Sequence, residues 1–461
     1  MLSHFITKTV PFKFRGIDFT FALSQGLFSS SDIDSGTKLL LKVFSNVLDD
    51  DAAALPARVL DAGCGMGVIG ICAAAAIAGG AARVRCQDRD ELARLLTAHN
   101  AALNHIPPET INAFTEPLLA GPPAAHWDLI LTNIPAKAGL PVLEDFVRRS
   151  TALLAENGRV IMVAVHTLAD FFRQAINDAG ARILREERGP EHRVFVYGRK
   201  TGPDTQTPVQ EPVNAGPGFL ARYPFYCRAF VDIKTDDIPL RIETVYGASG
   251  FDCQSAAERA ALILIEKLEH KLNSLGPETD TAGSAVAVAP ILLHEPGQGF
   301  LACRLYAILR RRMPSQTAAS ALPPVVLSGR NILTLEAARD NYARYANSPC
   351  VTVPAADLQL GAEALRTAAA HLTDTGDSAN GRYCLIIAFP ELLPQSSLPK
   401  GVDQLAGLWE GIPPLLCPGG VCIAGFGSTD AERFDRKKPA GFTRLGDIKR
   451  SGFRCLSYRF Q

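Results

Sequence analysis

The chain has 461 residues with 47 basic and 47 acidic side chains, so its formal net charge is zero. Hydrophobic residues make up 47% of it and charged residues 20%, which is the composition of a soluble globular protein of two or three domains. The balanced charge confines any nucleic-acid contact to a local patch, and because no apolar run approaches about 18 residues we expect no membrane span.

Eleven cysteines and nine histidines are scattered along the chain. The cysteine count is odd and no pair has C-x-x-C spacing, which predicts reduced thiols rather than a disulfide framework or a metal site. The first residues, Met1 to Lys8, lack the long apolar stretch of a signal peptide. We therefore expect a cytoplasmic protein that holds no metal.

The first 50 residues predict short strands followed by a helix. Aromatic residues recur up to about residue 21 in a pattern that suggests a small sheet or lid. After the segment that contains Phe28, either Asp34 or Ser35 precedes a helix from Thr37 to about Leu48, in which apolar residues recur at helical spacing.

A glycine-rich stretch at residues 58–70 is the centre of the first half. A short apolar strand leads into Asp61 and then into a loop with glycines at alternate positions, followed by an Ala-rich helix to about residue 79; the loop contains Gly63, Cys64, Gly65 and Gly67. Glycine lets the backbone adopt positive φ and lets a ligand approach closely. The free N–H groups of a helix start favour polar or anionic groups. We interpret this stretch as a nucleotide-binding loop; a plain glycine turn has the same local pattern.

Strands and helices alternate through the rest of the first half. The pattern predicts helices near 91–104, 142–154 and 168–179, and strands near 83–87, 110–114, 127–132, 159–165, 182–186 and 193–197. This alternation is typical of a doubly wound, mostly parallel sheet, here with an antiparallel last pair.

Residues 201–218 are rich in Pro, Gly, Thr and Gln and predict a linker between a domain at 1–200 and another at 219–461. The second half repeats the landmarks of the first in weaker form. Glu295 takes the place of Asp61, and the other matched positions are Phe251 for Phe28, Gly329 for Asp88, Asn341 for Asn100 and Phe389 for Asn133. We interpret this as a duplicated fold, the alternative being an unrelated α/β domain.

Three polar positions in the first half carry candidate chemistry. Asp88 ends the second strand, where a carboxylate can bind ribose hydroxyls, or alternatively cap a helix. Asn133 ends the fourth strand, where its amide could orient an amino nitrogen, with Pro135 stiffening the loop; a turn Asn before Pro is the alternative. Thr37, with Phe28 before it, could face a carboxylate or form an ordinary helix cap.

These motifs, in this order, resemble the "small-domain" class I S-adenosylmethionine methyltransferases. The segments that carry the resemblance are Gly26-Leu-Phe-Ser, Asp34-Ser-Gly-Thr37, the glycine loop and Asn133-Ile-Pro-Ala. The closest in pattern are ribosomal RNA guanine-N2 methyltransferases, which also have two tandem copies of the fold, one of them degenerate. The resemblance implies two tandem Rossmann-like α/β domains, each with a seven-stranded sheet. In that family the degenerate copy comes first, whereas here the weaker copy is the second.

The resemblance also implies roles for individual residues. The glycine loop, including Cys64, would hold the methionine part of S-adenosylmethionine, and Asp61 would orient the loop and the cofactor's amino group. Asp88 would bind ribose and Asn112 would lie beside adenine. The carboxylate end would meet Thr37 near Phe28, and Asn133 with Pro135 would bind the target amine.

The implied function is methylation of an exocyclic amine in ribosomal or other structured RNA, with guanine N2 as the acceptor. The family motif is Asn-Pro-Pro followed by an aromatic or other apolar residue, whereas this chain has Asn133-Ile-Pro135-Ala. A protein glutamine N-methyltransferase and a non-catalytic cofactor-binding scaffold are the alternatives. A dehydrogenase is disfavoured because the loop lacks G-x-G-x-x-G. The second copy is expected to bind neither cofactor nor amine, and the sequence leaves the oligomeric state open.

Overall fold

We analysed a computed structural model of the chain. It describes residues 2–50, 55–77, 82–119, 126–200, 218–235, 238–268, 289–311, 322–373 and 381–461. These residues divide into two compact units, one built mainly from residues 2–200 and the other mainly from residues 218–461. None of the described helices is long and apolar enough to span a membrane.

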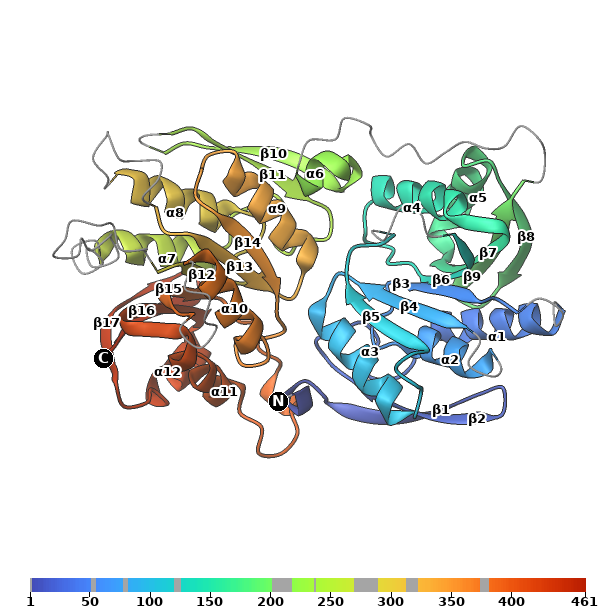
Figure 1. Cartoon of the computed structure of the whole chain (residues 1–461), viewed down its shortest axis with the longest axis horizontal. Coiled ribbons are helices and arrows are strands. Elements are labelled where there is room, and N and C mark those ends of the chain that lie inside the picture. The colour runs from blue at the N-terminus through green and yellow to red at the C-terminus, as the bar shows by residue number, and fades with distance from the viewer. Residues whose placement is uncertain are drawn as a thin grey trace. The chain divides into compact units, whose positions relative to one another are not determined.

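The first domain is a seven-stranded sheet in the order β5-β4-β3-β6-β7-β9-β8 (Figure 1). The first five strands in chain order pair in parallel, and β9 pairs antiparallel with both β7 and β8. The strands are β3 (Arg58–Ala62), β4 (Arg83–Asp88), β5 (Ile111–Thr115), β6 (Trp127–Asn133), β7 (Leu154–Val165), β8 (Ala181–Arg188) and β9 (His192–Arg199). The antiparallel last pair predicted from the sequence is confirmed.

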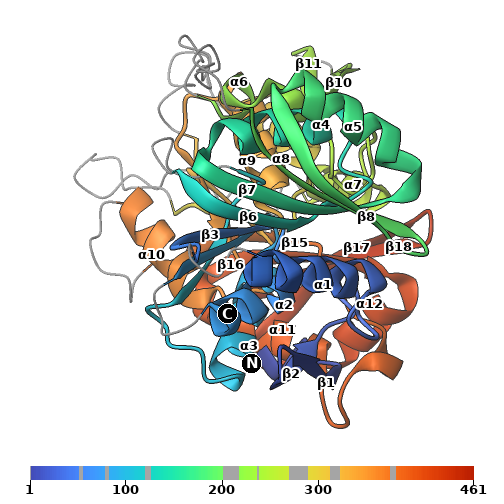
Figure 2. The same cartoon turned by 90° about the vertical axis from the view of Figure 1, so that its right-hand side faces the viewer.

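Helices cover both faces of this sheet, because its central strands are apolar on both sides. In Figures 1 and 2, α1, α2 and α3 lie on one face, and α4 and α5 lie on the other. The helices are α1 (Ser35–Asp50), α2 (Val68–Ala76), α3 (Glu91–Leu103), α4 (Leu140–Ala152) and α5 (Ala169–Asp178). A separate hairpin of β1 (Lys8–Phe14) and β2 (Ile17–Leu23) precedes them.

The second domain has the same architecture, with strand order β14-β13-β12-β15-β16-β18-β17 and a preceding hairpin of β10 (Cys227–Ile233) and β11 (Leu240–Val245). Its sheet strands are β12 (Ile291–His294), β13 (Val325–Gly329), β14 (Cys350–Pro354), β15 (Tyr383–Ala388), β16 (Leu416–Gly427), β17 (Phe442–Arg450) and β18 (Phe453–Phe460). Its helices are α6 (Phe219–Arg222), α7 (Ala256–Lys267), α8 (Phe300–Arg311), α9 (Ile332–Ala343), α10 (Ala362–Leu372), α11 (Gln404–Gly411) and α12 (Ser428–Arg436).

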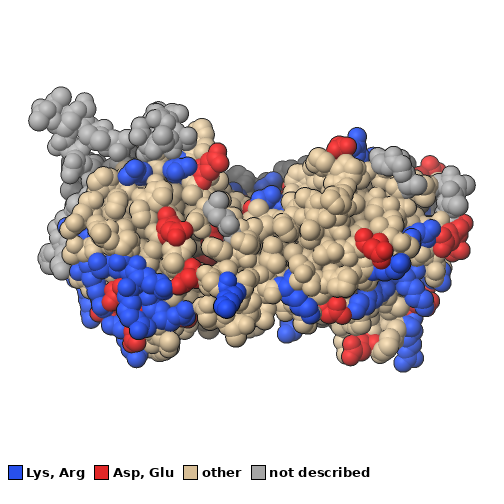
Figure 3. Space-filling view, turned by 90° about the horizontal axis from the view of Figure 1, so that it is seen from below, with Lys and Arg blue, Asp and Glu red and all other residues tan. Residues whose placement is uncertain are grey.

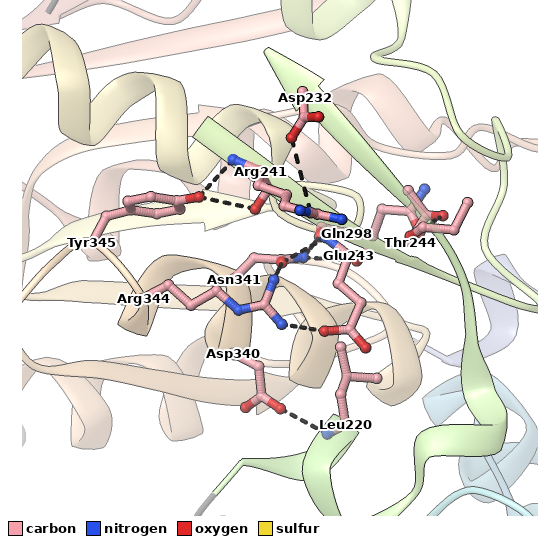
Figure 4. Close-up of polar contacts among 11 residues, drawn as sticks. Leu220, Asp232, Arg241, Glu243, Thr244, Gln298, Asp340, Asn341, Arg344 and Tyr345 are labelled. Atoms are coloured by element: carbon pink, nitrogen blue, oxygen red, sulfur yellow. Dashed lines mark hydrogen bonds and ion pairs between the residues drawn. The ribbon is translucent and has the colours of Figure 1, made fainter. Parts of the chain in front are cut away.

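One buried asparagine in each domain ties the hairpin to the glycine loop in the same way. Asn100 accepts a hydrogen bond from the Ala22 N–H at 2.8 Å and donates to the Met66 carbonyl at 2.9 Å. In the second domain, Asn341 accepts from the Glu243 N–H at 2.9 Å and donates to the Gln298 carbonyl at 2.8 Å (Figure 4). The shared strand order and this shared buried contact confirm that the chain contains one fold twice.

The predicted linker at 201–218 lies almost wholly outside the described residues. Its last residue, Gly218, precedes α6 as the N-cap. The Ala-rich helix of the first domain ends at Ala76, before the expected end near residue 79, because Ile77 has extended backbone; residues 78 and 79 lie outside the described residues.

Candidate active site at the carboxyl edge of the first sheet

The glycine loop connects β3 to α2 and depends on left-handed backbone at three positions. Gly63, Gly65 and Gly67 have φ values of 79°, 54° and 81°. A Cβ on Gly67 would lie 2.9 Å from the Thr97 methyl group, whereas no described atom lies within 4 Å of a Cβ built on Gly65. The Gln87 carbonyl anchors the loop by accepting from the N–H of Gly63 at 2.8 Å and of Cys64 at 3.1 Å. Gly67 is therefore needed for packing, and Gly65 borders open space.

Asp61 lies fully buried beneath the loop. Its Oδ2 accepts a hydrogen bond from the Gly70 N–H at 2.8 Å, which fixes the first turn of α2. Its Oδ1 is buried and accepts no hydrogen bond from the described residues. Burial raises the pKa of this carboxyl group to about 7. The side chain can thus orient the loop, but in this structure it is not exposed to a ligand's amino group.

The buried Asp61 makes stability depend on pH. Because its pKa is raised from an unfolded value near 4, the stability linked to this group is complete below about pH 4 and is lost as the pH rises through about 7. We expect Asp61→Asn to remove this dependence, which amounts to about 4 kcal/mol at most. Urea unfolding at about pH 5 and about pH 8 measures it. An equal drop in midpoint for wild type and variant would contradict this assignment.

Asp88 ends β4 beside the glycine loop. Its Oδ2 accepts from the Gly65 N–H at 3.0 Å and its Oδ1 accepts from the Asp90 N–H at 3.0 Å. Burial, and then the nearby charge of Asp90, raises the pKa of Asp88. The N-cap of α3 is Asp90, which accepts from the Leu92 N–H at 2.9 Å. Asp88 is therefore not needed as the helix cap, and its half-buried carboxylate lies next to the open space at Gly65.

Asn133 ends β6 and meets the start of α1. Its Nδ2 donates to Asp34 Oδ2 at 2.7 Å and to Thr37 Oγ1 at 3.1 Å. Its Oδ1 accepts no hydrogen bond from the described residues, so this oxygen remains available as an acceptor. Sequence reasoning treated Asp34 only as a possible helix cap and missed its contact with Asn133. The sequence did contain one signal for this contact, because the acid Asp34 directly precedes the helix that carries the candidate residue Thr37.

Of the other predicted residues, Thr37 contacts Asn133 and Asp34, whereas Phe28 and Pro135 are exposed. Asp34 engages both polar groups of Thr37, accepting from its N–H at 2.7 Å and from its hydroxyl at 3.3 Å, so a ligand carboxylate at Thr37 would face Asp34. Phe28 is 76% exposed on the loop before α1, and Pro135 is exposed after β6. The roles of Thr37, Phe28 and Pro135 stay predictions.

Asn112 does not lie with the other site residues. It is the second residue of β5 and is exposed, whereas Thr115 is the residue of β5 that pairs with Asp88 at the carboxyl edge. Three residues of extended strand place Asn112 roughly 10 Å back along the sheet. The contact of Asn112 with adenine stays a prediction.

The strand register of the second domain corrects one predicted equivalence. The Glu295 N–H donates to the Ser328 carbonyl at 2.7 Å, as the loop residues Gly63 and Cys64 donate to Gln87. Glu295 therefore stands at the start of the loop, and Leu293 occupies the place of Asp61. The prediction that Glu295 replaces Asp61 is wrong, because the apolar match was two residues out of register.

In the second domain, two glutamate side chains fill the space beside the loop, which is open at Gly65 in the first domain. Glu295 accepts from the Arg330 N–H at 2.7 Å, and its Cδ lies 2.9 Å from a Cβ built on Gly329, the counterpart of Asp88. Glu258 is 5% exposed, and its Oε1 lies 3.0 Å from a Cβ built on Gly297, the counterpart of Gly65. Burial raises the pKa of Glu258 to about 7. The second loop is thus occupied by the domain's own side chains.

The fold and the site of the first domain define its class. A seven-stranded sheet with one antiparallel strand inserted beside the fifth, and a glycine loop and polar residues at its carboxyl edge, is the class I methyltransferase architecture. Residues 18–179 match the model of the methyltransferase small domain family. The first domain is thus a methyltransferase small domain, and the predicted enzyme class, which uses S-adenosylmethionine, is confirmed.

Several known proteins are similar to this chain. Ribosomal RNA small subunit methyltransferase C of Chromohalobacter salexigens is 28% identical over 156 residues, which are 33% of this chain and 44% of that protein. Ribosomal protein L11 methyltransferase of a Synechococcus strain is 40% identical over 110 residues, which are 23% of this chain and 33% of that protein. The chain thus spans less than half the length of these two relatives.

A solved structure supports the tandem fold. The 16S rRNA N2 G1207 methyltransferase of T. thermophilus, in complex with AdoMet and guanosine, has a TM-score of 0.56 and 15% identity, with both chains fully covered. At this identity the likeness shows the fold alone. It agrees with the predicted pair of Rossmann-like domains.

Proposed function

We propose that the chain is an S-adenosylmethionine-dependent N-methyltransferase that methylates an exocyclic amine of a base in structured RNA, with ribosomal RNA and guanine N2 as the favoured acceptor. One observation carries the proposal: Asn133 presents an unused amide oxygen at the sheet edge that also carries the open glycine loop and Asp88. The named activities of the rRNA methyltransferase relatives support RNA as the substrate.

The residues present fit S-adenosylmethionine on three counts. Gly65 borders open space that a side chain would fill, and Asp88 has a half-buried carboxylate beside it that suits ribose hydroxyls. Asp61 holds the first turn of α2, and with it the loop, by accepting from the Gly70 N–H at 2.8 Å. The cofactor supplies an electrophilic methyl group on a positively charged sulfur, and the protein supplies binding and orientation.

Asn133 would position the acceptor amine. Its Oδ1 accepts one amine hydrogen, which fixes the direction of the nitrogen lone pair. Asp34 holds the amide in place by accepting from Nδ2 at 2.7 Å. The Asp34 carboxylate also stabilises the positive charge that develops on the amine. No strong base is required, because the methylated amine then loses its proton readily to water.

A second candidate acceptor is a protein amine or amide. The relative named as a ribosomal protein L11 methyltransferase is 40% identical over its matched segment, and it favours this reading.

Methyl transfer from tritium-labelled S-adenosylmethionine to dissociated ribosomal subunits tests the proposal. We expect label in RNA, released by ribonuclease, and recovered as N2-methylguanosine after digestion to nucleosides. Label in protein would favour the second candidate. Cofactor binding with no methyl transfer to either acceptor would favour the alternative of a non-catalytic cofactor-binding scaffold.

We expect one S-adenosylmethionine to bind per chain. The second loop is filled by Glu258 and Glu295, and Leu293 replaces the acid beneath it. Isothermal titration calorimetry of the full chain should give a stoichiometry near one, and Asp88→Ala should abolish the binding. A stoichiometry near two, with half of the sites surviving Asp88→Ala, would show that the second domain also binds.

A further inference from the structure

We propose that the second domain carries an RNA-docking surface on the outer side of α12 and the β17–β18 hairpin, which binds the phosphate backbone. This inference rests on the proposed function, since it takes RNA as the substrate. We call it the α12–β17 surface, and its cationic residues are Arg433, Arg436, Lys437, Lys438, Arg444, Lys449, Arg450 and Arg454.

The segment that forms the α12–β17 surface carries an excess of basic residues, whereas the rest of the chain carries an excess of acidic ones. Residues 428–461 contain nine basic and four acidic residues, which leaves 38 basic and 43 acidic residues elsewhere. The equivalent segment of the first domain, residues 169–200, contains seven basic and five acidic residues. Because both segments form the same helix and antiparallel strand pair, the fold itself does not require the excess of positive charge.

Ion pairs hold the helix and the hairpin together as one charged surface. Arg444 lies 2.9 Å from Asp435 of α12, and Arg454 lies 3.7 Å from Glu432 of the same helix. Figure 3 shows the resulting field of Lys and Arg side chains on this part of the second domain. The acidic residues of the segment are thus engaged within it, which leaves a net positive surface.

Three cations of the surface remain available to a partner. Arg436, Lys449 and Arg450 are exposed and make no ion pair with the residues that the structure describes. Exposed cations that have no protein counter-charge are the groups that bind phosphates and release counterions. The surface therefore fits a polyanion whose charges are spaced along a backbone, which is RNA.

This surface gives the second domain a role that its filled loop does not. Glu258 and Glu295 occupy the space that a cofactor would need. The α12–β17 surface would instead anchor the RNA through its backbone and leave the choice of the acceptor base to the first domain.

The test compares two triple variants of the full chain. One is Arg436→Ala, Lys449→Ala and Arg450→Ala. The matched control is Lys234→Ala, Arg241→Ala and Arg259→Ala, which removes three exposed cations that lie outside α12 and the β17–β18 hairpin in the same domain. Binding to a fluorescein-labelled RNA hairpin of about 20 base pairs is measured between about 50 and 200 mM salt.

We expect the first triple variant to bind the hairpin about tenfold more weakly at low salt, with the salt slope reduced by about 2 to 3. The control should change affinity less than about twofold. The KM of the first triple variant for ribosomal RNA should rise while its kcat stays the same. A charge-only pair, Lys449→Gln with Arg450→Gln, should show a smaller change of the same kind, and thermal melting checks that every variant is folded.

Unchanged RNA affinity in the first triple variant would overturn the proposal that the α12–β17 surface binds RNA. Loss of binding to phosphatidylglycerol vesicles, with RNA binding intact, would also overturn it and assign the patch to a lipid headgroup. The methyl-transfer assay separates this outcome from failure of the proposed function. If the wild type methylates RNA and the first triple variant has an unchanged KM, only the docking role of the α12–β17 surface is rejected. If the wild type binds RNA in a salt-dependent way but transfers methyl to no acceptor, the proposed methyltransferase function is rejected.

Discussion

Replacing Asn133 with alanine is expected to lower kcat for methyl transfer by about 100-fold or more, with little change in cofactor affinity. The amide oxygen of Asn133, the last residue of β6, is placed to accept a hydrogen from the target amine. Its donor side is already used by Asp34 and Thr37. Alanine removes this acceptor, and the Asp34 carboxylate loses one of its partners. Single-turnover kinetics with saturating RNA measures the effect.

Asn112→Ala is the matched control, because it removes the same side chain from an exposed position on β5, away from the carboxyl edge. We expect its kcat and its cofactor affinity to match wild type. Asp34→Ala should lower kcat as well, since the amide would no longer be held, and should leave cofactor affinity within about threefold. If Asn133→Ala transfers methyl at the wild-type rate, the proposed mechanism fails and the scaffold alternative gains support. A loss of cofactor affinity in Asn112→Ala would restore its predicted place beside adenine.

Replacing Gly65 with alanine is expected to weaken S-adenosylmethionine binding by about 100-fold. No described atom lies within 4 Å of a Cβ built there, so the methyl group would project into the space that the ligand is proposed to occupy. Gly65 also donates its N–H to Asp88, which couples the loop to the ribose-binding carboxylate. Calorimetric titration with the cofactor and with its demethylated product measures the loss.

Gly16→Ala separates ligand loss from backbone strain. Gly16 lies between β1 and β2 with a φ of 79°, and no described atom lies within 4 Å of a Cβ built on it. Both substitutions place alanine in left-handed backbone, which costs about 1 kcal/mol of folding free energy. We expect the two variants to melt at similar temperatures and only Gly65→Ala to lose the cofactor. Wild-type affinity in Gly65→Ala would place the ligand elsewhere.

Local patterns sufficed for much of the fold. The alternation of apolar strands and amphipathic helices predicted the doubly wound sheet, and the repeat of landmarks such as Asn100 and Asn341 predicted the duplication. The position of Asp88 at the end of a strand was also readable, because the carboxyl ends of parallel strands meet at one edge. These features depend on residue spacing within one element, which the sequence records directly.

Contacts between distant segments could not be read in this way. Asp34 and Asn133 are 99 residues apart, and their hydrogen bond exists because α1 packs against the sheet beside β6. The misplacement of Glu295 came from strand register, since a shift of two residues along a strand leaves the apolar pattern nearly unchanged.

The sequence by itself indicated the methyltransferase small domain of the first half, the two copies of the fold and the residues of the glycine loop, because these are encoded in short motifs with fixed spacing. The tertiary structure decided which of those residues meet. It placed Asp61 beneath the loop rather than in reach of a ligand, joined Asn133 to Asp34, and filled the second loop with Glu258 and Glu295. Each of these outcomes depends on side chains from separate elements converging at one sheet edge, and only the packed fold determines that convergence.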